Sequence, residues 1–229
     1  MKALIYKEMR LAMHPVCYVF VFFFPFMVLI PTYPLAVGFI YILSCYPILF
    51  LGANKGQQSN DLLYSVLLPI RKKDIVKARI FTVLIIQVTY MLLMSALVPL
   101  SHLIQDQIVQ SGGKFVPNIG FSLDGYVSVL AFGVVAFAIA DLIYFSIYYK
   151  NGRSILLSTL LMIFGFILFL LTFTVAIPVI EPFKPYKEFF CDSGLGIQFA
   201  ALGIAVAISI GLHFLTYRIA SKELELVDF

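Results

Sequence analysis

The chain alternates between long apolar runs and short polar segments, and the runs have the length of membrane-spanning helices. Six runs stand out, at residues 16–32, 35–53, 80–100, 126–149, 155–179 and 197–217. Crossing a bilayer core takes about 20 apolar residues in a helix. A transmembrane barrel would alternate apolar and polar residues, whereas these runs are continuous. Because only helices and closed barrels pair all backbone groups in lipid, the pattern predicts an all-α integral membrane protein with six transmembrane helices.

Composition agrees with this prediction. Of the 229 residues, 62% are hydrophobic and 12% are charged, about half the charged share of a soluble domain. No polar segment is long enough to build a separate core, so residues 1–229 are expected to form a single transmembrane domain. The three cysteines give no disulfide framework and are interpreted as ordinary thiols.

The distribution of basic residues orients the six spans. If both termini lie on one side, that side holds thirteen basic residues and the other side three, which predicts cytoplasmic termini. Residues 101–122 and 180–195 are then extracellular loops. The thirteen residues are Lys2, Lys7, Arg10, Lys55, Arg71, Lys72, Lys73, Lys77, Arg79, Lys150, Arg153, Arg218 and Lys222, and the three are Lys114, Lys184 and Lys187.

Residues 1–15 precede the first span and mix basic with apolar residues. On a helix Lys7, Arg10 and His14 would share one face, with Leu4 on the other. This pattern is typical of a short interfacial helix on the inner leaflet, although a plain flanking segment explains it equally well. A cleaved signal peptide is not expected, because no small-residue cleavage site follows and five further spans do.

The cytoplasmic segment between the second and third spans reads "SNDLLYSVLLPIRKKDIVKARI" and predicts a short helix followed by a basic turn. Ser59 or Asn60 can cap the helix, and Asp61 is favourable in its first turn. Pro69 disfavours helix at the residue before it and so marks the end. An apolar stripe at helical spacing runs through Leu62, Leu63, Val66 and Leu67.

After the turn, Asp74 is expected to cap a second helix that continues into the third span. From Ile75 to Leu100 it would be about 39 Å long. A bilayer core is about 30 Å thick, so this helix tilts or projects, with Lys77 and Arg79 at headgroup level. Two interpretations of the basic cluster stay open: it retains the loop inside and touches anionic lipid, or it docks a cytoplasmic partner.

Together these features resemble the permease subunit of an ABC-2 type ABC exporter. The resemblance rests on the opening "MKALIYKEMRL", the six spans, "LLYSVLLPIRKKDIVKARI" before the third span, and the charged tail "RIASKELELVDF". Related permeases carry a Pro, basic and Ile-Val pattern there, which Leu67, Pro69, Arg71, Ile75, Val76 and Arg79 match. Many relatives place a Glu upstream of this helix, whereas this chain reads "ANKGQQSND", so that acidic contact is in doubt.

The resemblance implies that residues 59–70 form a coupling helix seated in a groove of a separate ATPase subunit. The residues it implies at the ATPase contact are Asn60, Asp61, Leu63, Tyr64, Leu67, Pro69, Arg71, Lys72, Lys73 and Asp74. The chain contains no G-x-x-x-x-G-K-[ST] loop, so no cofactor is expected in it, and ATP and magnesium are expected on the partner. Six spans are half of the usual twelve, so a second copy or a paralogue would complete the transporter.

The resemblance points to export of an amphipathic or lipophilic substrate, such as toxic or antimicrobial peptides with self-immunity, across a bacterial plasma membrane. The alternative is a nucleotide-independent protein, either a small secondary transporter or a membrane scaffold. A secondary transporter usually shows matched broken helices in two halves, which this sequence lacks. Nucleic-acid binding is not expected, because the basic cluster is flanked by membrane-length apolar runs.

Polar residues within the spans are candidates for the substrate path or for gating. Asp141 is acidic within the fourth span, where a charge is costly, and a structural hydrogen bond between helices is the competing interpretation. Gln87 and Tyr90 in the third span give a weaker signal. His213 is expected at the inner interface. No metal site is predicted, because His102 and Asp106 in the outer loop lack a third ligand.

Overall fold

The computed structural model describes residues 2–12, 16–23, 25–26, 70–110, 126–150, 155–171 and 195–226, and all elements in this part of the chain are helical. The elements are α1 (Lys2–Lys7), the π-helix η1 (Glu8–Ala12), α2 (Val16–Phe23), α5 (Lys72–Gln110), α6 (Tyr126–Lys150), α7 (Ile155–Leu171) and α10 (Leu195–Leu226). The predicted all-α fold class is therefore confirmed for the described residues. The count of six spans and the cytoplasmic side of the termini stay predictions.

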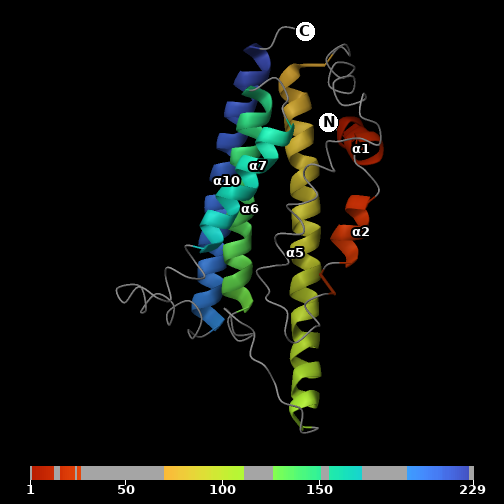
Figure 1. The fold of residues 1–229 in the computed structure, drawn as a ribbon, viewed down its shortest axis with the longest axis vertical. Helices are drawn as coiled ribbons and strands as arrows, with labels where there is room; N and C mark the ends of the chain where they lie inside the picture. The colour runs from red at the N-terminus through yellow and green to blue at the C-terminus, as the bar shows by residue number, and fades with distance from the viewer. Residues whose placement is uncertain are drawn as a thin grey trace, which may run out of the picture.

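Three of these helices are long and apolar enough to cross a membrane. They comprise Lys72–Leu97, Leu130–Lys150 and Leu195–Leu226, and Leu156–Phe169 forms a shorter apolar helix. They correspond to the third, fourth, sixth and fifth predicted runs, respectively. The first turn of α5, the last turns of α6 and α10, and α1 all lie at the same end of the molecule (Figure 1).

Helix α6 is the centre of the bundle. It packs most extensively against α10 and next against α7, whereas α5 contacts α10 more than it contacts α6. Helices α1 and α2 lie on the other side of α5 (Figure 1). The core joins large side chains of α5, α6 and α7, namely Tyr90, Met94, Phe137, Tyr144, Phe145, Tyr149, Met162 and Phe166.

Aromatic stacking and a glycine hold α7 closely against α6. The rings of Phe132 and Phe169 are stacked with centroids 4.8 Å apart. Gly165 of α7 lies against Ile143 of α6: a Cβ added to this glycine would be 2.7 Å from the Cδ1 atom of Ile143, and the end of that side chain would have to shift.

Helix α5 differs from the predicted helix at both ends. It begins at Lys72, three residues earlier than expected, because the backbone N–H of Asp74 donates to the carbonyl of Arg71 at 2.9 Å. Asp74 is therefore in the first turn and not the cap, although its charge still favours a helix N-terminus. The helix also continues to Gln110, ten residues into the segment predicted as the loop 101–122. Its 39 residues span about 58 Å, and it projects beyond the other helices (Figure 1).

The N-terminal segment lies against the first turns of α5. Leu4 is buried against Ile75 and Ala78, and Ile5 and Ile70 pack around them. From Glu8 onward the segment is a π-helix, so the α-helical faces inferred from the sequence do not continue through it. Whether this segment also lies on the membrane surface stays a prediction.

Candidate functional site

A polar cluster joins three spans near the middle of the bundle. Asp141 on α6 is fully buried, and its carboxylate accepts hydrogen bonds from Nε2 of Gln87 on α5, at 3.1 Å to each oxygen. Nε2 of His213 on α10 lies 2.9 Å from Oδ2 of Asp141. Asp141 thus contacts two other helices.

The hydrogen bonds of His213 determine how many protons this cluster holds. Nδ1 lies 2.7 Å from the backbone carbonyl of Ser209, and a carbonyl can only accept, so Nδ1 carries a hydrogen. The 2.9 Å contact between Nε2 and Asp141 needs a second proton between the two atoms. Whether that proton sits on the imidazole or on the carboxyl, the pair has no net charge. A neutral pair avoids the high cost of an isolated charge in a span.

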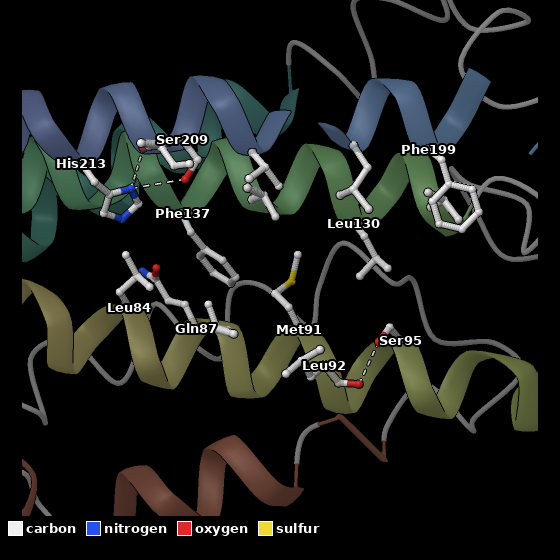
Figure 2. A pocket seen from close by; sticks show the side chains of 16 residues that line it. Leu84, Gln87, Met91, Leu92, Ser95, Leu130, Phe137, Phe199, Ser209 and His213 are labelled. Atoms are coloured by element: carbon white, nitrogen blue, oxygen red, sulfur yellow. Dashed lines mark hydrogen bonds between the residues drawn. The ribbon is translucent and has the colours of Figure 1, made fainter. Parts of the chain in front are cut away.

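Next to this cluster is a cavity of about 700 Å³ bounded by α5, α6 and α10. Figure 2 shows Leu84, Gln87 and Met91 pointing from α5 toward Phe137 and His213 on the facing helices. Its wall is mostly aliphatic and aromatic, and the polar side chains in it are Gln87, Ser95, Ser209 and His213. Ligand sites are typically apolar hollows with a few polar groups of this kind.

The chain was also compared with known proteins. The family model described as ABC-2 family transporter protein matches residues 3–220. The chain belongs to the ABC-2 transporter family. No curated protein and no solved structure matches it.

Membership in this family makes the chain a multi-pass membrane protein and the membrane subunit of an ABC transporter. An ABC-2 permease is a membrane component that works with an ATPase partner. The resemblance stated from the sequence is therefore confirmed at the level of the family. The alternative of a nucleotide-independent scaffold or carrier loses support, because family membership implies an ATPase.

The predicted ATPase contact of the permease is only partly described. Asn60, Asp61, Leu63, Tyr64, Leu67 and Pro69 lie outside the described residues. Of the remaining four, Arg71 directly precedes α5, and Lys72, Lys73 and Asp74 form its first turn. Arg71 and Lys73 are exposed, and Lys72 and Asp74 are half-buried. Lys73 Nζ lies 3.1 Å from Oε1 of Glu225 near the end of α10, with both side chains about half exposed.

Arg79 on α5 is buried among protein side chains, and its position at headgroup level stays a prediction. Its Nε donates to Oε2 of Glu8 at 3.1 Å, while Nη1 lies 3.4 Å from the Tyr148 hydroxyl. Lys7 adds a second cation 3.7 Å from Oε1 of Glu8. The Glu8 carboxylate stabilises the buried guanidinium, which would be costly to bury without a partner.

The candidate residues from the spans separate into two groups. Gln87 and Asp141 are joined by a hydrogen bond between helices, and Gln87 also lines the cavity. Their role in the substrate path stays a prediction. Tyr90 is fully buried in the helix core and does not line the cavity. The side chain of His213 is only 12% exposed and faces Asp141, and its position at the membrane interface stays a prediction.

Sequence reasoning missed the contributions of Glu8 and His213. The available signal was weak: Glu8 is an acid among basic and apolar residues, and His213 stands in an apolar run one turn after Ser209. The described residues contain no group of three metal-ligating side chains. The side chains of His102 and Asp106 lie outside the described part of the chain.

Proposed function

We propose that this ABC-2 family chain is the permease subunit of an ATP-driven exporter of amphipathic or lipophilic compounds. A separate ATPase hydrolyses ATP, and its motion reaches the membrane through the predicted coupling helix 59–70. Two permease chains, identical or paralogous, complete the transporter in a bacterial plasma membrane. The substrates include toxic or antimicrobial peptides, against which export gives self-immunity.

The observation that carries this proposal is the position of α5. Its first turn directly follows the predicted coupling helix, and its middle part lines the 700 Å³ cavity with Leu84, Gln87 and Met91. One continuous helix therefore connects the predicted ATPase contact with the candidate substrate cavity. A displacement of its first turns changes the wall of the cavity without any intervening joint.

The ATPase contact is tested by co-purification from detergent. Wild type is compared with the double variant Leu63→Asp/Leu67→Asp, which places two negative charges on the apolar stripe, and with Ser65→Asp, which places one negative charge elsewhere on that predicted helix. We expect a Walker-containing ATPase to co-purify with wild type and with Ser65→Asp, and at least tenfold less of it with the double variant. ATP hydrolysis in the eluate should follow the same order.

Two results would count against the proposal. A stably folded wild-type chain that brings down no ATPase would remove the ATP-driven mechanism and make Asp141 the first residue to test for ion-coupled transport. Equal ATPase recovery with all three chains would leave the exporter intact but move the contact away from residues 59–70.

A further inference from the structure

A second, smaller cavity of about 290 Å³ lies between α5 and α10 and shares part of its wall with the large one. Leu84 and His213 line both cavities, so the two cavities adjoin on either side of these side chains. The smaller cavity is otherwise lined mainly by Phe81, Phe214 and Tyr217, with Lys77 at the end of the bundle near the termini. Together the two cavities form one crevice, which we call the α5–α10 crevice.

The crevice follows one stripe along each helix. On α5, Lys77, Phe81, Leu84 and Val88 recur every three or four residues and therefore share a face. From Lys77 to Ser95, at the far end of the large cavity, the rise along the helix is about 27 Å. The crevice is thus long and narrow, with a cation at one end and apolar walls along most of its length.

The charges at the near end favour an anion. Lys77 is exposed, and no hydrogen bond or ion pair within the described residues engages it, even though Asp74 is one turn away. Arg218 lies over the ring of Phe214, 5.4 Å from its centroid, and adds a second cation beside the same cavity. Basic residues that keep the segment before α5 on the cytoplasmic side of the membrane would account for cations at this end. They would not account for a lysine that lines an apolar cavity.

The charges deeper in the crevice are balanced. The pair of His213 and Asp141 is neutral by its hydrogen bonds, and the other polar wall residues of the large cavity are the uncharged Gln87, Ser95 and Ser209. A charged group would find no counter-ion there, whereas an apolar chain finds continuous contacts. His213 is fixed between its two partners and so holds its side of the passage past Leu84 in place.

The size of the smaller cavity distinguishes between ligand classes. The cavity next to Lys77, of about 290 Å³, has less than half the volume of the large cavity, of about 700 Å³. The end of the crevice with the cation therefore favours a slender ligand, such as a single hydrocarbon chain.

We propose that the α5–α10 crevice binds a single-chain amphiphile with one anionic head, the head at Lys77 and Arg218 and the tail running past Leu84 into the large cavity. To call this ligand a substrate rests on the proposed exporter function, whereas the binding is a property of the chain itself. The head chemistry is shared by soluble amphiphiles such as fatty acids and by anionic membrane lipids, and the experiment separates these sources.

The test uses the full chain in phosphatidylcholine nanodiscs and the fluorescent fatty acid cis-parinaric acid, with its uncharged methyl ester as the matched probe. We compare wild type with Lys77→Gln and with Lys222→Gln. The second variant is the matched control, because Lys222 is an exposed lysine on α10 that lines neither cavity. Loss of the cation should weaken binding of the acid by about five- to tenfold, just below the range of a buried charge-assisted hydrogen bond, because Lys77 is exposed. The ester should change by less than about twofold, and Lys222→Gln should leave both probes unaffected.

A second variant tests the tail. Leu84→Trp narrows the passage between the two cavities, so it should reduce the advantage of the long parinaric chain over decanoate, used as a competitor, while leaving the contribution of Lys77 unchanged. Lys77→Gln alters only an exposed side chain and should fold. The test of head binding therefore still decides the proposal even if the tryptophan variant fails to fold.

The outcomes separate the two sources and the two proposals. Displacement of the probe by lysophosphatidylglycerol, a membrane lipid with one acyl chain, assigns the site to a membrane lipid, and retention of the probe assigns it to a soluble amphiphile. Equal affinity for acid and ester, unchanged by Lys77→Gln, would overturn the proposal. That result would leave ATPase co-purification untouched, and loss of the ATPase would leave probe binding untouched.

Discussion

Two polar clusters join α5 to α6, and they balance charge in different ways. Near the termini Arg79 pairs with Glu8, which comes from the N-terminal segment, and contacts Tyr148 on α6. About 12 Å further along α5, Gln87 binds Asp141, which shares a proton with His213. The first cluster is an ion pair supplied from outside the spans, and the second is a neutral network made by the spans alone.

The difference shows which parts of the chain depend on one another. The ion pair is complete only when the N-terminal segment lies against α5, because Glu8 reaches Arg79 together with the contact of Leu4 on Ile75. The neutral network needs no such segment and lies beside the cavity. The contact of residues 2–12 with the first turns of α5 therefore depends on the ion pair of Glu8 and Arg79. The network beside the cavity does not depend on that contact.

The largest effect is expected from breaking the ion pair. Glu8→Gln leaves the buried Arg79 guanidinium without its carboxylate, which should destabilise the folded chain by about 3–5 kcal/mol. The midpoint of thermal unfolding in detergent measures this loss, and limited proteolysis should show faster cleavage within residues 2–12.

The control is the double variant Glu8→Gln/Arg79→Met, which buries no charge and should recover most of the lost stability. If the double variant is as unstable as the single one, the contact acts through packing and not through charge, and the contrast between the two clusters disappears.

An intermediate effect is expected at Asp141. Asp141→Leu leaves the Gln87 amide and a His213 nitrogen without their partner and should destabilise by about 2–3 kcal/mol. Asp141→Asn should cost about 1 kcal/mol or less, because its carbonyl oxygen can accept from Gln87 and its amide can donate to neutral His213. Thermal unfolding of the two variants side by side measures the difference, and an Asn variant as unstable as the Leu variant would show that the network needs a negative charge.

The two clusters also mark what could be read from the sequence. The apolar runs predicted α5, α6 and α10, because the length of a run and its lack of polar residues fix a spanning helix. Pairing across the fold was not readable: Glu8 and Arg79 are 71 residues apart, and Asp141 and His213 are 72. A uniformly apolar helix carries little periodic signal about which face meets its neighbour, so the rotation that brings His213 to Asp141 stays hidden.

The bounds of α5 show a second reason why the sequence-based prediction and the structure differ. The sequence placed its start at the capping residue Asp74 and its end with the apolar run, but a helix can start at a neighbouring residue when a backbone bond such as that of Asp74 to Arg71 is made. Beyond the apolar run, residues 101–110 continue the same helix, although their polar character had favoured a loop. The charge of Arg79 likewise did not indicate that its side chain is buried.

The smallest effect is expected at the exposed pair of Lys73 and Glu225, which is an ion pair like that of Arg79 but lies in solvent. Both side chains are about half exposed, so water and salt screen most of the attraction between them. Glu225→Gln should therefore lower the free energy of unfolding by about 0.5 kcal/mol or less. Lys73→Gln should have an equally small effect on thermal unfolding.

The two variants should nevertheless differ in ATPase co-purification, because Lys73 belongs to the predicted contact and Glu225 does not. A reduced ATPase yield with Lys73→Gln alone would assign Lys73 to the partner, whereas equal yields would leave its bond to α10 as its role. Since burial and not the presence of opposite charges sets the scale, this pair should cost several times less to break than the one at Glu8.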